Sequence, residues 1–183
     1  MEVNQTSSRS AKPCQVIFIR HGERADLAPE KDVQYDVKCD PPLTPLGVTQ
    51  VEETGHFLKR YVEQHGFEEV IIECSPFIRT VQTAAIIAKA IGKSKVRVQY
   101  KYHEWLHPAF YDNNPMEDLY LRNRSKEEIK KVFMQGVADI DYDHEDEPGF
   151  KESNVVYPEE NMDLCIERMR RLCKEINESY QNS

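Results

Sequence analysis

Apolar runs and helical patterns follow one another through the first half of the chain. Residues 16–19 and 70–72 are unbroken apolar runs with polar neighbours, a pattern typical of strands buried on both faces of a parallel sheet. Residues 96–100 alternate between apolar and polar side chains, which predicts a third strand. Each predicted strand is separated from the next by a segment with helical spacing, so the chain has a strand-helix-strand rhythm.

Three longer segments are predicted to be helices. The first runs from Pro45 to about Gln64, because Thr44 can cap its free amides and Pro45 suits the first helical position. Its core-facing stripe is formed by Val51, Phe57, Leu58, Tyr61 and Val62.

The second helix runs from Arg79 to Ile91, and Gly92 follows where a left-handed cap is expected. The third covers about 159–180, with a core-facing stripe of Met162, Cys165, Ile166, Met169, Leu172, Cys173 and Ile176.

This order of elements predicts the fold class and the domain organisation. Right-handed crossovers between parallel strands give a three-layer α/β/α domain with a mostly parallel sheet. We expect a disordered tail at 1–13 and one domain over 14–183. Within that domain, residues 107–158 break the rhythm and predict an insertion over the carboxyl edge of the sheet. The insertion is expected to hold a helix near 127–133 and an acidic loop at 141–147.

Composition narrows the classes of partner. The 183 residues carry a net charge of −8. This argues against binding to nucleic acid or to an anionic membrane, because both partners require a broad basic face on the protein. The five cysteines are scattered and form no C-x-x-C pair, so we expect a reducing compartment and a cytoplasmic protein. No apolar run approaches the length of a membrane span.

Chemically useful side chains follow three of the predicted strands. Arg20, His21 and Arg24 come after the first, Arg79 follows the second, and Glu104 follows the third. The carboxyl ends of parallel strands meet at one edge of a sheet, where ligands bind. Three arginines beside an imidazole suit a polyanion, so the sequence predicts a local phosphate site at this edge.

Three motifs in the chain resemble those of a known family. They are R-H-G at 20–22, L-T-P-L-G-x-x-Q at 43–50 and S-P-x-x-R-T-x-Q-T-A at 75–84. Together they resemble the histidine phosphatase superfamily, the phosphoglycerate-mutase-like phosphohydrolases. With R-H-G-E-R at 20–24 and Y-H-E-W at 102–105, the chain is most similar to the ubiquitin-associated, SH3-domain-containing phosphatases and the ecdysteroid-phosphate phosphatases.

The resemblance implies roles for the residues at this edge. His21 would attack phosphorus and form a phosphohistidine, Arg20, Arg24 and Arg79 would bind the phosphoryl oxygens, and Glu104 would protonate the leaving oxygen. No cofactor or metal is implied. The expected activity is hydrolysis of a phosphomonoester rather than mutase chemistry, and the expected ligand is a phosphorylated small molecule or a phosphoprotein.

The chain departs from the family pattern in one respect. The family carries a second active-site histidine on a strand after the last helix, and no strand or histidine follows 176 here. The sheet would then be C-terminally incomplete, with an edge that needs cover. Three explanations stay open: the chain is a fragment, a partner chain completes it, or it is a degenerate member of the family.

Two rival functions also stay open. The first is a catalytically inactive, phosphatase-like structural subunit of a larger assembly, in which the arginines would pair with internal carboxylates such as Glu104. The second is a zinc metallopeptidase, because residues 103–107 match H-E-x-x-H. The match follows a predicted strand directly, and Pro108 disfavours the helix that this motif requires.

Overall fold

The computed structural model describes residues 15–28, 33–134, 141–143 and 155–181. The helices and strands of this part of the chain are α1 (Pro45–His65), β1 (Glu73–Cys74), α2 (Ile78–Ala90), β2 (Lys95–Val98), α3 (Tyr120–Asn123), α4 (Lys126–Phe133), β3 (Asp141–Asp143) and α5 (Met162–Gln181). Short 3-10 turns cover Ala25–Leu27, Tyr100–Tyr102 and Pro115–Glu117. The tail predicted at 1–13 lies outside the described residues.

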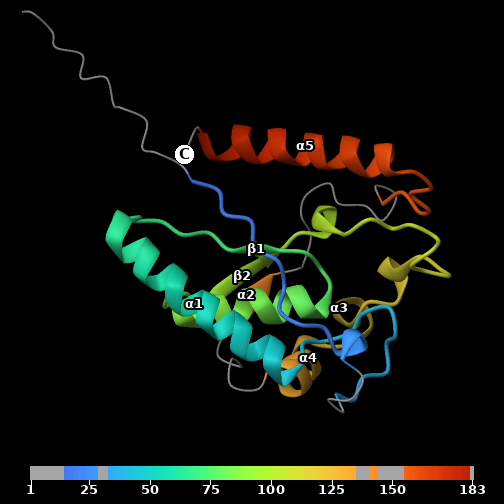
Figure 1. Cartoon of the computed structure of the whole chain (residues 1–183), viewed down its shortest axis with the longest axis horizontal. Coiled ribbons are helices and arrows are strands. Elements are labelled where there is room, and N and C mark those ends of the chain that lie inside the picture. Colours follow the sequence, from blue (N-terminus) through green and yellow to red (C-terminus); the bar gives the residue numbers. More distant parts are fainter. Residues whose placement is uncertain (1–14, 29–32, 135–140, 144–154, 182–183) are drawn as a thin grey trace, which may run out of the picture.

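The sheet is parallel, as the sequence predicts. Its strand order is β1-β2-β3, and both pairs run parallel, with Glu73 opposite Arg97 and Lys95 opposite Asp141. In Figure 1, α1 and α2 lie on one side of the strands and α5 lies on the other, which gives the three layers of an α/β/α fold.

Local signals in the sequence set the ends of α1 and α2. The side chain of Thr44 accepts a hydrogen bond from Gly47 N at 3.0 Å, and Pro45 opens α1. Gly66 and Gly92 follow the two helices with φ of 63° and 75°, the left-handed conformation that glycine adopts without strain. The predicted bounds of both helices, and of the helix now labelled α4, are therefore confirmed to within a few residues.

The main core lies between α1, α2, α4 and the strands. Helices α1 and α2 approach closely at Gly55, where an added β-carbon would stand 2.7 Å from the Ala90 side chain. This core includes the fully buried side chains of Val81, Val96 and Ile129. A smaller cluster, Phe77, Leu106, Met116 and Leu119, packs under the segment that follows β2.

The first predicted strand is not a strand in the structure. Residues 15–23 have no strand assignment, and the side chains of Val16, Ile17, Phe18 and Ile19 are 42–72% exposed. An apolar run is buried only where other elements cover it and pair with its backbone, and the described residues place no strand beside this one. The second predicted strand is shortened: β1 begins at Glu73, and Ile71 stays 36% exposed.

Three further predictions, one about a loop and two about burial, are wrong. Residues 141–143 form β3 rather than part of an acidic loop, because pairing with β2 uses main-chain groups and so depends little on acidic side chains; residues 144–147 lie outside the described part. On α5, Leu172 is buried but Met162, Ile166 and Met169 are exposed, so the predicted stripe is not a core face. Phe57 of α1 is also exposed.

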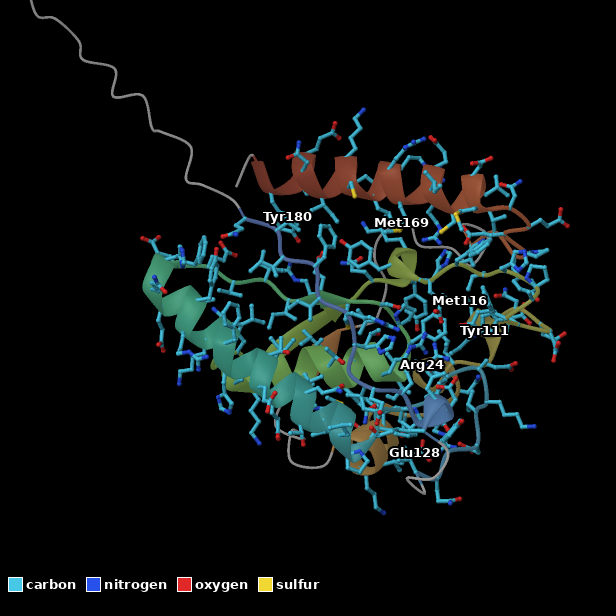
Figure 2. The ribbon with its side chains drawn as sticks, viewed as in Figure 1. Arg24, Tyr111, Met116, Glu128, Met169 and Tyr180 are labelled. Carbon is cyan, nitrogen blue, oxygen red and sulfur yellow. The ribbon has the colours of Figure 1, made fainter. Side chains whose placement is uncertain are left out.

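Polar contacts at both ends help to hold α5 to the body. Tyr180, on the side of α5 that faces the strands (Figure 2), donates a hydrogen bond to Glu73 of β1 at 3.0 Å. Arg168 forms an ion pair with Glu159 at 2.8 Å near the other end of the helix. None of the helices in the described ranges combines the length and the apolar character that crossing a membrane requires.

Candidate active site

The loop after the first apolar run is pressed against the start of α1. A β-carbon on Gly22 would lie 2.4 Å from the carbonyl oxygen of Gly47, and one on Gly47 would lie 2.4 Å from the carbonyl oxygen of Glu23. Only glycine permits so close an approach of two backbones. Two of the sequence motifs therefore meet through their glycines.

Hydrogen bonds fix this contact on both sides of the glycine pair. Thr44 N donates to Glu23 O at 3.0 Å, and Ala25 N donates to Pro42 O at 2.9 Å. The side-chain oxygen of Gln50 accepts from Glu23 N at 2.9 Å. The backbone that carries His21 is thus anchored, although the apolar run before it is exposed.

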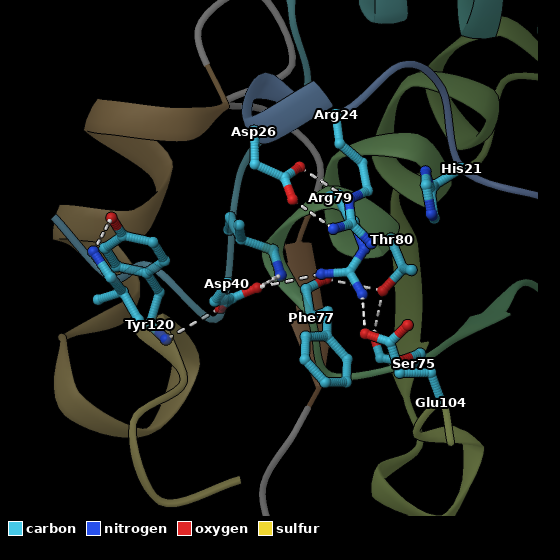
Figure 3. Close-up of polar contacts among 12 residues, drawn as sticks. His21, Arg24, Asp26, Asp40, Ser75, Phe77, Arg79, Thr80, Glu104 and Tyr120 are labelled. Atoms are coloured by element: carbon cyan, nitrogen blue, oxygen red, sulfur yellow. Dashed lines mark hydrogen bonds and ion pairs between the residues drawn. The ribbon is translucent and has the colours of Figure 1, made fainter. Parts of the chain in front are cut away.

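His21 lies half-buried at the end of this anchored loop (Figure 3). Its Nδ1 is 2.7 Å from the carbonyl oxygen of Gly22, and because a carbonyl only accepts, Nδ1 carries the proton and donates. Burial lowers the pKa of the imidazole, and the charges of Arg79, Arg24 and Arg20 lower it further. A neutral ring with an unprotonated Nε2 is the nucleophilic form of histidine.

Arg79 occupies the first turn of α2 and is only 2% exposed. Its guanidinium lies 4.3 Å from the centre of the Phe77 ring, and its Nη2 donates to Oε1 of Glu104. Its Nε and Nη1 are buried and have no hydrogen-bond partner among the described residues. Unsatisfied donors on a buried charge are costly, so this guanidinium is suited to an incoming anion.

Asp40 lies beside the guanidinium of Arg79, and the sequence analysis did not identify it as a site residue. It is fully buried, and it accepts hydrogen bonds from Ile78 N at 2.7 Å and Tyr120 N at 3.1 Å. Its Oδ1 lies 3.9 Å from Nη1 of Arg79. Burial raises the pKa of Asp40 to about 6, against the lowering effect of the two backbone donors and of Arg79. A signal existed: Asp40 stands directly before the P-P-L-T-P-L-G run that opens α1.

Two other side chains close the site and were also missed. The hydroxyl of Tyr111 donates to the same Oε1 of Glu104 that Arg79 contacts, so Glu104 accepts from both. Burial, followed by the nearby Glu104, raises the pKa of Tyr111 and keeps it protonated. Asp26 forms an ion pair with Arg24. Nothing in the spacing of either residue links it to the site, because Asp26 lies in a short 3-10 turn and Tyr111 in an irregular segment.

The structure brings four of the five predicted site residues together. His21, Arg24, Arg79 and Glu104 meet at one edge of the fold, as Figure 3 shows. Arg20 is exposed, and within the described ranges it has no ion pair or hydrogen bond, although its charge acts on His21. Arg24 and Arg79 each contact a carboxylate, so the positive charge of the site is partly compensated within the protein.

The H-E-x-x-H match does not have the geometry of a zinc motif. Residues 103–107 form no helix, so the two histidines are not placed one helical turn apart. His103 is buried, and its Nδ1 donates to Glu104 O at 2.9 Å. His107 packs against Trp105 with ring centres 4.6 Å apart and ring planes tilted by 53°. In the described part of the chain, no group of three or more His, Cys, Asp or Glu side chains could hold a metal ion.

Comparison with known proteins agrees with the three motifs. The model of the histidine phosphatase superfamily (branch 1) matches residues 16–183. Fourteen chains of solved structures match. One is the ecdysone phosphate phosphatase, EPPase, from Bombix mori in complex with tungstate, which is 18% identical over 67% of this chain and 68% of that chain, with a TM-score of 0.38. No curated protein matches at a comparable level of significance.

Proposed function

The chain belongs to the histidine phosphatase superfamily, and we propose that it hydrolyses phosphomonoesters through a phosphohistidine formed on His21. The observation that carries this proposal is the buried guanidinium of Arg79, whose Nε and Nη1 have no hydrogen-bond partner among the described residues. The neutral imidazole of His21 lies within the electrostatic reach of that guanidinium. A phosphoryl group would supply acceptors to the arginine and an electrophile to the histidine.

In the first half of the proposed reaction, Nε2 of His21 attacks phosphorus. The bond between phosphorus and the ester oxygen breaks, and that oxygen takes the proton held by Glu104. Arg79 and Arg24 donate to the equatorial oxygens, while Arg20 adds positive charge from the exposed side. Because Nδ1 is fixed by Gly22 O at 2.7 Å, the ring keeps its reactive nitrogen free.

The second half returns the enzyme to its starting state. Water attacks the phosphohistidine, the bond between phosphorus and nitrogen breaks, and the carboxylate of Glu104 takes a proton from the water. Arg79 exchanges its contact with Glu104 for the phosphoryl oxygens when the ester binds, which leaves Glu104 free to hold and transfer a proton. The products are an alcohol or phenol and inorganic phosphate. The proposed substrate class is a phosphorylated small molecule or a phosphoprotein in the cytoplasm.

Hydrolysis of para-nitrophenyl phosphate by the purified chain tests the proposal. Wild type should release para-nitrophenol, and His21→Ala should abolish the release. His56→Ala is the matched control, because His56 is an exposed histidine of α1 and the variant should keep full activity. Equal release by wild type and His21→Ala would contradict a phosphohistidine mechanism.

A second function, a catalytically inactive structural subunit, is favoured by a different observation. Arg79 contacts Glu104 and Arg24 contacts Asp26, so two of the arginines already have internal carboxylate partners. In a subunit that binds no phosphate, these pairs would persist and serve stability alone. This alternative predicts no hydrolysis and no phosphorylation of His21, and it predicts that neither wild type nor Arg79→Lys binds inorganic phosphate.

A further inference from the structure

The segment that carries Glu104 has no regular structure of its own. Residues 103–107 lie between a 3-10 turn and an irregular stretch, outside any helix or strand. Its backbone groups therefore depend on partners elsewhere in the chain. His103 N donates to Tyr100 O at 3.2 Å, but the carbonyl oxygens of His103 and Glu104 both accept from a single side chain on α5, that of Arg168.

Arg168 reaches this segment from a distant part of the sequence. Its Nη1 donates to His103 O at 2.9 Å and its Nη2 donates to Glu104 O at 3.2 Å. Its Nε and Nη2 also donate to the two carboxylate oxygens of Glu159, at 2.8 and 3.0 Å. A guanidinium held by such a two-pronged pair has a fixed plane, so the direction of its remaining donors is fixed as well.

Glu159 joins the same segment from the other side. It is 2% exposed, and its Oε2 accepts from Leu106 N at 3.1 Å. Glu159 N donates to Leu106 O at 3.0 Å, and Glu159 O accepts from Trp105 Nε1 at 3.0 Å. Burial opposes charge on Glu159, but the hydrogen bonds from Arg168 and Leu106 N lower its pKa, so the pair stays ionic.

Glu104 is thus held at two ends by different groups. Arg79 and Tyr111 contact its side chain, and they belong to the site described above. Arg168 contacts its backbone, and within the described ranges no hydrogen bond or ion pair joins Arg168 to the arginines proposed to bind phosphate. We propose that Arg168, with Glu159, is the positioning residue that sets where the Glu104 carboxyl group stands relative to the leaving oxygen. This inference rests on the proposed function.

The consequence is specific to one part of the reaction. When Arg79 turns from Glu104 to the phosphoryl oxygens, the side chain of Glu104 loses a contact, and its position then depends on the backbone that Arg168 holds. A displacement of about 1 Å in a reacting group can cost on the order of a hundredfold in rate. Loss of Arg168 should therefore slow proton transfer to the leaving oxygen more than attack by His21.

Two substrates separate proton transfer from attack. The para-nitrophenolate leaves para-nitrophenyl phosphate without a proton, whereas the alkoxide of glycerol 2-phosphate needs one. For Arg168→Gln we expect kcat/KM, which reports the steps up to release of the leaving group, to fall at least about tenfold further for glycerol 2-phosphate than for para-nitrophenyl phosphate. Glu159→Gln should change the ratio in the same direction, and Arg168→Lys should give an intermediate ratio, because lysine cannot form the two-pronged pair.

Arg170→Gln is the matched control for the loss of a positive charge on α5, since Arg170 is an exposed residue of the same helix. Its ratio of the two kcat/KM values should equal that of wild type. General destabilisation would lower both rates by the same factor, so an unchanged ratio in Arg168→Gln would overturn the inference while leaving the proposed function intact. If Arg168→Gln does not fold, the ratios of Arg168→Lys and Glu159→Gln decide in the same way. Failure of wild type to hydrolyse either substrate would overturn the proposed function and this inference together.

Discussion

Gly22 and Gly47 lie in backbone contact, so close that a β-carbon on Gly22 would stand 2.4 Å from the carbonyl oxygen of Gly47. One glycine follows His21, and the other belongs to the first turn of α1. The contact gives a physical reason why an R-H-G sequence and an L-T-P-L-G sequence occur in the same chain: each supplies the space that the other backbone occupies.

Gly22→Ala should displace the loop of His21 from α1. We expect a loss of about 1–3 kcal/mol in the free energy of unfolding, because the new methyl group meets rigid backbone. We also expect weaker binding of inorganic phosphate, measured by calorimetry. Gly66→Ala is the control. The φ of 63° at Gly66 makes the substitution cost about 1 kcal/mol in the free energy of unfolding. Nothing lies within 4 Å of the added β-carbon, so phosphate binding should not change. Unaltered phosphate binding in Gly22→Ala would show that the contact does not position the site.

Asp40 should make stability depend on pH in a defined window. Its folded pKa of about 6 is above the ordinary value of 3.8, because burial and the nearby Glu104 outweigh the donors from Ile78, Tyr120 and Arg79. The folded state therefore binds the extra proton, and the contribution of Asp40 to stability is complete below about pH 4 and is lost as pH rises through about 6. The difference between the two pKa values corresponds to about 3 kcal/mol.

Urea unfolding of wild type and Asp40→Asn between pH 4 and pH 7 measures this contribution. The free energy of unfolding of wild type should fall relative to that of the variant as pH rises across the window. Asp112→Asn, at an exposed position, should run parallel to wild type. Parallel curves for wild type and Asp40→Asn would mean that the carboxyl group titrates at its ordinary value.

The pKa of His21 should respond to the arginines around it. Burial is the main cause of its lowered pKa, and Arg79, Arg24 and Arg20 contribute in that order. In Arg24→Gln the pKa should move up toward 6.5 and still stay below it, because burial remains. An NMR titration of the His21 ring protons gives the value directly, with Arg60→Gln on the outer face of α1 as the control. A lower pKa in Arg24→Gln would contradict the proposed charge arrangement.

Arg79→Lys should weaken phosphate binding by at least about tenfold, because an ammonium group cannot present the planar set of donors that a guanidinium offers to phosphate oxygens. Calorimetric titration with inorganic phosphate measures the change. Arg60→Lys makes the same substitution at an exposed site and should bind like wild type. If neither wild type nor Arg79→Lys binds phosphate, the arginine serves Glu104 alone and the inactive subunit becomes the better account.

Local sequence signals predicted much of the fold. The bounds of α1 and α2 followed from Thr44, Pro45 and Gly92, because capping depends on a few neighbouring residues. The parallel sheet followed from the order of elements. The edge at which Arg79 and Glu104 meet followed from the rule that parallel strands end on the same side. His21 reaches this edge from a segment with no strand assignment, and the motifs rather than the strand rule identified it.

Burial across the layers could not be predicted in this way. The run at 16–19 and the apolar stripe of α5 have the composition of core residues, yet burial requires a covering element, and composition does not say whether one is present. Asp40, Tyr111 and Arg168 were missed for a related reason. Each acts through contacts between segments far apart in the chain, for example 65 residues between Arg168 and His103.

Trapping the covalent intermediate tests the central claim most directly. Glu104→Gln should still form the phosphohistidine from para-nitrophenyl phosphate, whose leaving group needs no proton, but should hydrolyse it slowly because the group that takes the proton from water is gone. Mass spectrometry at neutral to alkaline pH should then find one phosphoryl group on His21 in this variant, and none in the double variant that also carries His21→Ala. Absence of a phosphoryl group from His21 in both wild type and Glu104→Gln would contradict the account.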